Sequence, residues 1–467
     1  MKRHLPRILI TAERSGSGKT TAVCGLLALL KRKGLVPAAL KIGPDYIDPM
    51  FHRAVLGIPT GNLDTFFTEP EPARSILLAD TEGADLAVLE GVMGYFDGLG
   101  GISSRGSACE ASSVTGTPAV LVVSAKGGSV SCAASVNGFL KFRPDVETPA
   151  DNGIAGVILN RVSPMYYPKL RRVIEETCGV PVLGYIPERK EFALPSRHLG
   201  LVTPEELPAF HTWLEALADT LEETLDLTAL LSAAEGAPDL PAPSAKAPEE
   251  GAESAARVRI AVSRDEAFCF SYRENEALLA RFGAEIVDVS PLHDPHLPED
   301  IQGIYLTGGY PELHARTLSE NKTFLAELRQ ALEKGMPCIA ECGGFLALLQ
   351  ELTDAEGRTY PMAGALPGHG FPAGRLQRFG YFEAETQEDG LFGPAGTVLR
   401  GHEFHHWDSD ANGEGILLTR PLSGKTGRAC VYTENLAAGF PHWYFPSCPQ
   451  AAEAFVSRCR EKGGERC

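Results

Sequence analysis

The chain has 467 residues, 44% of them hydrophobic and 22% charged, so its length predicts two or three globular domains and excludes a disordered or fibrous protein. Lys and Arg total 43 against 60 Asp and Glu, and the resulting net charge of −17 disfavours binding to nucleic acid. No apolar run approaches the roughly 20 residues of a membrane-spanning helix, so we expect a cytoplasmic protein without a membrane partner.

Eleven cysteines are spread along the chain without a C-x-x-C pair. This distribution favours neither a disulfide framework nor a structural zinc site. We therefore expect most of the thiols to be buried, and a reactive one must be identified from its own surroundings.

The first half of the chain alternates short β-branched runs with helical patterns, which is typical of a buried parallel sheet. In such a sheet the functional residues are expected at the carboxyl ends of the strands. The predicted strands cover residues 7–12, 84–91, 119–125, 154–161 and 181–187.

A glycine-rich segment, AERSGSGKTT at residues 12–21, follows the first strand and precedes an apolar helical run. Gly16 and Gly18 allow backbone N–H groups to converge on phosphate oxygens, and Lys19 adds a positive charge. The hydroxyl of Thr20 is a suitable ligand for Mg²⁺. We therefore predict a nucleotide site made of Ser15, Gly16, Ser17, Gly18, Lys19, Thr20 and Thr21.

This segment departs from the strict pattern G-x-x-x-x-G-K-[ST], because Glu13 stands where the first glycine would be. The alternative interpretation is a Gly/Ser-rich turn that carries a Lys-Thr pair by chance. The order of strand, glycines, Lys-Thr and helix favours the phosphate loop.

Acidic residues that could hold a metal follow in two further segments. Asp45 and Asp48 lie in a loop bounded by Gly and Pro that follows a strand-like segment, PAALK at residues 37–41. Glu90 ends a predicted strand, with Asp97 shortly after it. Our hypothesis is that Thr20, Asp45 and Glu90 hold Mg²⁺. Asp48 and Asp97 would then position the acceptor or the activated phosphate. The alternative interpretation is that these are ordinary loop acids or helix caps.

One segment, residues 233–256, is rich in Pro, Ala, Gly, Ser and Glu and has no aromatic or β-branched residue. Such a composition cannot bury enough apolar surface to offset the ordering of the chain. We therefore predict a linker between one domain at residues 1–232 and another at residues 257–467.

The second half of the chain repeats the α/β pattern. The whole protein is thus predicted to contain two doubly wound, mainly parallel sheets. The strands predicted in the second half cover residues 259–265, 285–290, 303–309 and 337–344.

The last of these strands ends in a candidate nucleophile elbow. The strand stops at Glu341, a helix starts near Gly343, and Cys342 lies at the corner. A thiolate at a helix N-terminus has a lowered pKa, and the glycines permit a tight turn. A cysteine at a strand end is more often simply buried, as we expect for Cys338 inside the strand.

Partners for Cys342 are found on either side of it in the sequence. Gly308 and Gly309 end the preceding strand, and their N–H groups could form an oxyanion hole. His442 lies in a short apolar strand near the C-terminus and is available as a base, although an isolated histidine there would more often be structural.

The set of Cys342, His442 and the glycine pair resembles a class I glutamine amidotransferase domain, in which cysteine attacks the glutamine carboxamide and ammonia is released. That family commonly carries His-x-Glu, whereas Tyr444 stands at the third position here. The acid that orients the histidine is therefore absent or supplied from elsewhere in the chain.

Seven motifs together resemble the cobyrinic acid a,c-diamide synthase family over nearly the whole chain. Each motif is weak alone, and their joint order across both halves is specific. They are the variant phosphate loop, KIGPDYIDPMFH (residues 41–52), NLDTFF (62–67), EGVMGYFDG (90–98), PSRHLGLV (195–202), ECGG (341–344) and RGHEFHHWD (400–408).

This resemblance implies a dethiobiotin-synthetase-like ATPase domain fused to a flavodoxin-like class I glutaminase. The implied activity is that of an ATP-dependent, glutamine-hydrolysing carbon-nitrogen ligase with ATP and Mg²⁺ as cofactors. It would phosphorylate the a and c side-chain carboxylates of a corrin ring, and ammonia would displace the phosphate. The implied substrates are cobyrinic acid or a related tetrapyrrole, glutamine and ATP. Whether the protein forms a homodimer is left open by the sequence.

The residues fit this chemistry. A carboxylate is a poor acyl electrophile, and phosphoryl transfer supplies a better leaving group. Ammonia must reach the acyl phosphate without being protonated, so the two sites should face each other across a shielded passage. We interpret RGHEFHHWD as a loop that lines this route, with metal ligands or packed polar strand residues as the alternatives. Tyr46, Phe51 and Tyr95 could grip the ring or belong to the core.

Two further hypotheses remain. A relative acting on hydrogenobyrinic acid or nickel-sirohydrochlorin would differ only in its macrocycle. A partition-type ATPase switch is suggested by Arg14, which stands where those dimeric proteins carry a signature lysine. That second hypothesis leaves the elbow, His442 and RGHEFHHWD unexplained.

Overall fold

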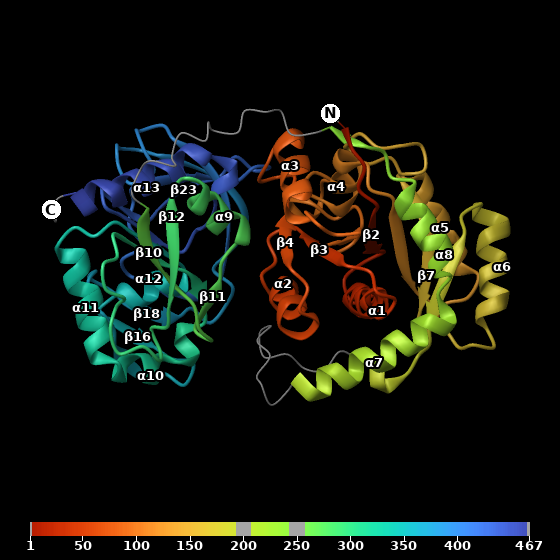
Figure 1. Ribbon diagram of the computed structural model, residues 1–467, viewed down its shortest axis with the longest axis horizontal. Helices are drawn as coiled ribbons and strands as arrows, with labels where there is room; N and C mark the ends of the chain where they lie inside the picture. Colours follow the sequence, from red (N-terminus) through yellow and green to blue (C-terminus); the bar gives the residue numbers. More distant parts are fainter. Residues whose placement is uncertain (1, 193–206, 242–256, 465–467) are drawn as a thin grey trace. The chain divides into compact units, whose positions relative to one another are not determined.

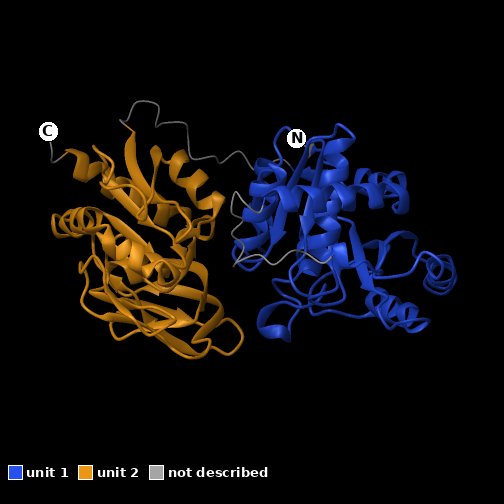
Figure 2. Ribbon diagram, turned by 90° about the horizontal axis from the view of Figure 1, so that it is seen from below, with its two compact units in different colours: residues 1–245 blue, residues 246–467 orange. Residues whose placement is uncertain are grey.

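The computed structural model describes residues 2–192, 207–241 and 257–464. The predicted motif at residues 195–202 and most of the predicted linker lie outside these ranges. The chain divides into two compact units, residues 1–245 and 246–467, which Figure 2 shows in different colours.

The first unit is built on a seven-stranded sheet with the order β4-β3-β5-β2-β6-β7-β8 (Figure 1). All neighbouring strands in it are parallel, as the apolar β-branched runs predicted. The strand β4 was not predicted, because its sequence TGNL contains Gly and Asn, which are depleted in strands. The strands are β2 (Arg7–Ala12), β3 (Pro37–Ile42), β4 (Thr60–Leu63), β5 (Leu86–Glu90), β6 (Ala119–Ser124), β7 (Ile154–Asn160) and β8 (Val182–Ile186).

Helices cover both faces of this sheet because successive strand residues point to opposite sides. Ile8 and Ile10 of β2 pack into one hydrophobic core, and Leu9 between them packs into the other. The first core takes side chains from α1 (Lys19–Arg32), α2 (Ile47–Phe51), α7 (Leu207–Thr224) and α8 (Leu227–Glu235), and the second from α3 (Pro70–Asp80), α4 (Ala108–Thr115), α5 (Ser131–Lys141) and α6 (Tyr167–Cys178).

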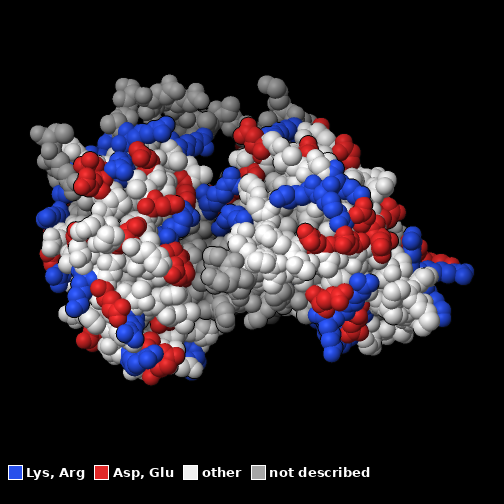
Figure 3. All heavy atoms as spheres, turned by 60° about the horizontal axis from the view of Figure 1, so that its bottom comes forward, with Lys and Arg blue, Asp and Glu red and all other residues white. Residues whose placement is uncertain are grey.

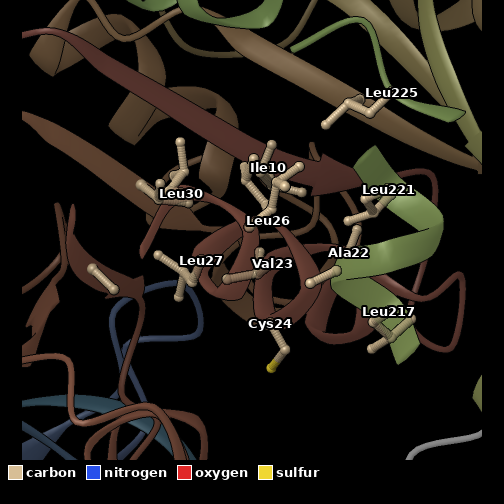
Figure 4. Close-up of a cluster of buried hydrophobic side chains, with 14 of the residues drawn as sticks. Ile10, Ala22, Val23, Cys24, Leu26, Leu27, Leu30, Leu217, Leu221 and Leu225 are labelled. Carbon is tan, nitrogen blue, oxygen red and sulfur yellow. The ribbon is translucent and has the colours of Figure 1, made fainter. Parts of the chain in front are cut away.

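The helix that follows the phosphate loop is anchored in the first core. Figure 4 shows Leu26 of α1 close to Ile10, with Leu221 of α7 beside Ala22 of the same helix. Burying each of these leucine and isoleucine side chains stabilises the fold by about 1.5–3 kcal/mol. The N-terminus of α1 is thereby held rigidly at the edge of the sheet.

The predicted linker starts too early. Residues 233–241 pack on the first unit, where Ala234 and Leu240 are buried. The short strand β9 (Leu240–Pro241) pairs with β1 (Lys2–Arg3) in antiparallel orientation. Ala234 and Leu240 pack into the two hydrophobic cores of the first unit. The composition of the segment did not predict this packing.

The second unit contains a six-stranded sheet with the order β12-β10-β13-β15-β25-β24, parallel except for β24. Helices again cover both faces, since Ala261 packs into one core and Ile260 and Val262 into the other. The two predicted α/β sheets are thus confirmed. The strands are β10 (Val258–Ser263), β12 (Ala284–Val289), β13 (Gly303–Leu306), β15 (Cys338–Glu341), β24 (Val431–Tyr432) and β25 (Leu436–Gly439), and the helices are α9 (Arg273–Arg281), α10 (Ala315–Glu320), α11 (Lys322–Glu333), α12 (Gly343–Leu348) and α13 (Pro449–Gly464).

Two further sheets in the second unit were not predicted. One has five antiparallel strands and the other four strands, and both lie between α12 and α13 in the sequence. The segment RGHEFHHWD, predicted as a loop, belongs to strands of both sheets. The first contains β19 (Arg378–Thr386), β20 (Val398–His405), β22 (Ile416–Thr419), β23 (Thr426–Ala429) and β26 (His442–Tyr444), and the second β16 (Glu351–Thr353), β17 (Thr359–Pro361), β18 (His369–Pro372) and β21 (Trp407–Ser409).

Basic and acidic side chains are interspersed on the face of the protein that Figure 3 displays. Among the residues that the structure describes, no helix combines the length and the apolar character needed to cross a membrane.

Candidate active sites

The phosphate loop lies between β2 and α1, at the carboxyl edge of the parallel sheet. Gly16 and Gly18 have φ values of 78° and 98°, which favour glycine, and Gly18 caps the N-terminus of α1. The side chain of Asn160, at the end of β7, donates a hydrogen bond to the carbonyl oxygen of Ser17 at 2.7 Å. The predicted loop is therefore held at a helix N-terminus, the position in which backbone N–H groups bind phosphate.

The loop lysine is buried. Lys19 Nζ donates a hydrogen bond to the carbonyl oxygen of Met93, a residue of the EGVMGYFDG motif. Burial, followed by the nearby charge of Lys41, lowers the pKa of Lys19 to about 8. The two lysines and the acidic groups near them form one electrostatic cluster.

Thr20 and two carboxylates meet beside the loop. Thr20 Oγ1 donates a hydrogen bond to Glu90 Oε1 at 2.7 Å and lies 3.5 Å from Asp48 Oδ2. Lys41 Nζ lies 2.6 Å from Asp48 Oδ2 and 3.0 Å from Glu90 Oε1. Lys41 and Glu90 are partners in the register of β3 and β5, which explains why this buried cation reaches both acids.

Burial perturbs the ionisation of this cluster. It raises the pKa of Glu90 to about 7, although Lys41 opposes the shift. Burial alone would lower the pKa of Lys41, but Glu90, Asp48 and Asp45 outweigh it and hold that pKa above its usual value. Perturbed groups gathered at the end of buried strands are typical of a functional site.

The other two predicted acids have different surroundings. Asp45 Oδ1 accepts hydrogen bonds from the backbone N–H groups of Ile47 at 2.8 Å and Asp48 at 3.2 Å, so this carboxylate shapes its own loop. Burial raises the pKa of Asp45, against the effect of Lys41 at 3.6 Å. Asp97 Oδ2 accepts a hydrogen bond from the Gly94 N–H at 2.8 Å.

The donors around Thr20 fit a magnesium ion. A hydroxyl and two carboxylates supply the oxygen ligands that Mg²⁺ prefers. Glu90 Oε2 is buried and accepts no hydrogen bond from the described residues, and His52 Nε2 lies 3.5 Å from it. Asp48 joins this group by its contact with Thr20, whereas the predicted ligand Asp45 has no such contact among those found.

Two of the proposed ring-gripping aromatics have structural partners. Phe51 packs edge-on against Phe210 of α7, with ring centroids 5.1 Å apart. The hydroxyl of Tyr95 donates a hydrogen bond to the carbonyl oxygen of Asn152 at 2.6 Å. Both side chains are fully buried, which favours the interpretation as core residues.

The second candidate site is the elbow between β15 and α12. Cys342 has φ 45° and ψ −101°, a strained conformation that turns the chain sharply from strand to helix. Its N–H donates a hydrogen bond to the carbonyl oxygen of Gly439 at 2.7 Å, which holds the corner against β25. The side chain is 8% exposed.

The expected lowering of the Cys342 pKa is wrong for this structure. Burial, and next the charge of Glu312, raise the pKa of the thiol well above its usual value. The helix that follows has only six residues, and its N-terminus does not outweigh the loss of solvent. The thiol is therefore neutral near pH 7, and its activation requires a base.

The predicted glycine pair, the elbow and the histidine converge. A methyl group added to Gly308 would overlap the ring of His442. A methyl group added to Gly343, the residue after the nucleophile, would lie 3.1 Å from the Gly309 nitrogen. Gly308 and Gly309 form β14, which pairs with β11 (Phe268–Phe270). The structure thus gathers the candidate oxyanion donors, the elbow and the candidate base at one corner.

The RGHEFHHWD strands lie beside this corner. The ring of His402 stacks on that of His442, with centroids 5.0 Å apart and planes 16° apart. Glu403 forms ion pairs with Arg378 and Arg420. Among the described residues, no group of three or more His, Cys, Asp and Glu side chains could hold a metal ion, so the metal interpretation of this segment finds no support.

Sequence reasoning assigned no role to three residues at these sites. Lys41 and Asn160 stand at the ends of recognised strands, and their positions there were the available signal. Glu341, whose Oε2 lies 3.4 Å from His442 Nδ1, was noted only as the end of its strand.

The comparisons with known proteins agree with both halves of this description. Residues 8–202 match the CobQ/CobB/MinD/ParA nucleotide binding domain. Residues 259–448 match the CobB/CobQ-like glutamine amidotransferase domain.

Several curated relatives align over most of the chain. The cobyrinate a,c-diamide synthase of Salmonella typhimurium strain LT2 is 39% identical over 462 residues, which cover 97% of this chain and 98% of that protein. The enzyme of the same name from Listeria innocua serovar 6a is 41% identical over 402 residues, or 86% of each chain. A solved structure of PurLQS from Thermotoga maritima aligns with 43% of this chain and 97% of its own, at 18% identity and a TM-score of 0.31.

The chain therefore belongs to the cobyrinate a,c-diamide synthase family, as the order of its motifs predicted. It is a glutamine-dependent amidotransferase that uses ATP, a ligase with a nucleotide-binding domain and a glutaminase domain.

Proposed function

We propose that this enzyme converts the a and c side-chain carboxylates of cobyrinic acid to amides, with ATP as the activating reagent and glutamine as the nitrogen source. The observation that carries the proposal is the near full-length similarity to proteins named cobyrinate a,c-diamide synthase, together with two separate clusters of reactive groups.

In the first unit, a carboxylate of the macrocycle takes the γ-phosphoryl group of ATP and becomes an acyl phosphate. The N–H groups of residues 15–21 and the buried Lys19 would bind the phosphates. Thr20, Asp48 and Glu90 would hold Mg²⁺, which when bound neutralises developing charge on the phosphates. Asp45 would keep the acidic loop in shape.

Lys41 opposes the protonation of the acidic cluster in this proposal. Its ammonium group is fully buried and lies between Asp48 and Glu90, so it compensates two carboxylates that would otherwise take up protons. Asp97, hydrogen-bonded to the Gly94 N–H, would position the acceptor carboxylate.

In the second unit, the sulfur of Cys342 attacks the carboxamide carbon of glutamine. His442 takes the thiol proton and passes it to the leaving nitrogen, so ammonia departs and a thioester remains. The backbone N–H groups of Gly308 and Gly309 would stabilise the oxyanion. Water then hydrolyses the thioester to glutamate. Ammonia attacks the acyl phosphate, and an amide and inorganic phosphate are the products.

The macrocycle is tested directly by mass spectrometry. We expect cobyrinic acid, incubated with the enzyme, ATP, Mg²⁺ and glutamine, to undergo two successive replacements of OH by NH₂. Hydrogenobyrinic acid and nickel-sirohydrochlorin in parallel reactions distinguish the related activities. If one of these two is amidated and cobyrinic acid is left unchanged, our substrate assignment is wrong.

The division of labour is tested with Cys342→Ala. This variant should lose the use of glutamine and keep amidation with added ammonia, because the acyl phosphate forms without the thiol. Glutamine consumption and amide formation are measured separately. Equal loss with both nitrogen sources in a folded protein would contradict the proposed roles.

A further inference from the structure

A carboxylate lies beside the Nδ1 atom of His442, the nitrogen that does not take the proton when Nε2 of a histidine acts as the base. Glu341 is the last residue of β15, and its Oε2 lies 3.4 Å from His442 Nδ1. The two side chains are 1% and 2% exposed. At this depth a charge interacts strongly with its neighbour, because little solvent screens it.

The carboxylate of Glu341 is held in place by its other oxygen. Glu341 Oε1 accepts a hydrogen bond from the Tyr305 hydroxyl at 2.8 Å and another from the Trp443 N–H at 3.2 Å. Glu341 Oε2 accepts no hydrogen bond from the described residues, so no other described donor competes with the imidazole for this oxygen. Trp443 follows His442 directly, which ties the carboxylate to the strand that carries the histidine.

The other candidates on the neighbouring described strands are not placed for this role. Glu403 alternates with His402 along β20 and therefore points to the other face of the strand, where Arg378 and Arg420 bind it. Tyr444 stands where related glutaminases carry the acid, and its ring packs edge-on against Tyr272 with centroids 5.1 Å apart.

We propose that Glu341 is the positioning acid of the glutaminase and completes a triad with Cys342 and His442, its acid directly preceding the nucleophile in the sequence. This inference rests on the proposed roles of the cysteine and the histidine. By accepting a hydrogen bond from the Nδ1–H group, Glu341 holds the tautomer in which the Nε2 lone pair is free to take the proton of the Cys342 thiol. It also stabilises the imidazolium until that proton passes to the leaving ammonia.

Because the pKa of the Cys342 thiol is raised, the reaction needs a base that Glu341 holds in the right tautomer. A buried neutral Cys342 does not ionise on its own near pH 7, so proton transfer must accompany the attack on the carboxamide. In the other tautomer the proton is on Nε2 and the lone pair is on Nδ1, so Nε2 cannot accept the proton of the thiol.

The decisive variant is Glu341→Gln in the full chain, because it keeps the size of the side chain and an acceptor for Tyr305 and Trp443. Its amide N–H₂ would face Nδ1 and favour the tautomer that cannot accept from the thiol. We expect kcat for glutamine hydrolysis to fall by about 10²–10⁴-fold, and KM for glutamine to change less than about threefold. Amidation with added ammonia should be retained.

Tyr305→Phe is the matched control. It removes a hydrogen bond from the same carboxylate and leaves the contact with His442 in place. We expect kcat for glutamine to fall less than about tenfold, the loss of a single hydrogen bond. A loss equal to that of Glu341→Gln would show that the hydrogen-bond network alone matters and would overturn the inference.

Glu341→Asp covers the case in which the amide variant does not fold. It keeps the charge on a shorter side chain, so glutaminase activity per active site should rank Glu, then Asp, then Gln. Active sites are titrated with a diazo-ketone analogue of glutamine that alkylates Cys342. If Glu341→Gln hydrolyses glutamine as fast as Glu341→Asp per titrated site, or faster, the inference is wrong. If Cys342→Ala still hydrolyses glutamine, the proposed function itself fails, and the two failures are thereby distinguished.

Discussion

Met93 and Cys342 share an uncommon backbone conformation, each with φ 45°, and each lies at one of the two candidate sites. The carbonyl of Met93 accepts a hydrogen bond from Lys19, and the strained residue Cys342 turns the chain from β15 into α12. Non-glycine residues hold such conformations only where the surrounding structure compensates, which is common at functional sites.

Residue-level patterns pointed to the candidate nucleophile, its candidate base and the phosphate loop, because each lies in a local motif with its own spacing. They did not locate the contact between Glu341 and His442, which are far apart in the sequence and meet only through strand order. The direction of the Cys342 pKa shift was wrong for a similar reason, since burial of the elbow is a property of the folded chain.

The metal assignment can be tested one acid at a time. We expect Asp48→Asn to reduce ATP-dependent amidation by at least about 10²-fold and to raise the Mg²⁺ concentration needed for half-maximal rate. Asp45→Asn should have a smaller effect on the Mg²⁺ requirement, because its carboxylate caps backbone N–H groups and does not contact Thr20. Amide formation is measured in a titration of Mg²⁺ with ammonia as the nitrogen source. If Asp45→Asn raises the Mg²⁺ requirement more than Asp48→Asn does, Asp45 is the ligand and our assignment is wrong.

At the scale of elements, both candidate sites lie at the carboxyl ends of parallel strands. Glu90 ends β5 and Asn160 ends β7 beside the phosphate loop, while Glu341 ends β15 beside the elbow. This placement could be predicted, because the apolar runs marked the strands and parallel strands share one carboxyl edge.

The five-stranded and four-stranded sheets of the second unit could not be predicted in the same way. Their strands are short and often polar, as in TGRA of β23, and carry no continuous apolar run. One of them nevertheless brings His402 against His442.

The close packing of β14 against His442 gives a prediction about an element. Gly308→Ala should lower glutaminase activity by about 10–10²-fold, because the added methyl group displaces the imidazole ring and small misplacements are costly in catalysis. Gly427→Ala is the control, since a methyl group there, on β23 of the same unit, meets no atom within 4 Å. Glutamine hydrolysis and the thermal unfolding midpoint are measured for both. Unchanged hydrolysis in Gly308→Ala would contradict the placement of the base.

At the scale of the whole molecule, each unit has its own hydrophobic cores. Two cores flank the sheet of the first unit, and two others flank the parallel sheet of the second. Independent cores on both sides of a sheet are what a separately folding domain requires. The composition of residues 233–256, rich in Pro, Ala and Glu, predicted a linker, and the division between the two units after residue 245 falls within that segment.

A shortened chain of residues 1–241 should therefore fold, and it should amidate the macrocycle from ATP and ammonia while failing with glutamine. It keeps β9, whose pairing with β1 closes the first unit and which a cut at residue 232 would remove. The matched control is residues 1–232, which lacks the buried Ala234 and Leu240 and should unfold at a lower temperature by several degrees, because losing roughly 2 kcal/mol shifts the midpoint of a domain this size by about 4–8 °C. Circular dichroism during heating measures the midpoints, and mass spectrometry measures the amides. If the longer fragment folds and makes no amide from ammonia, residues of the second unit take part in amidation itself, and the separation of the two chemistries between the units is wrong.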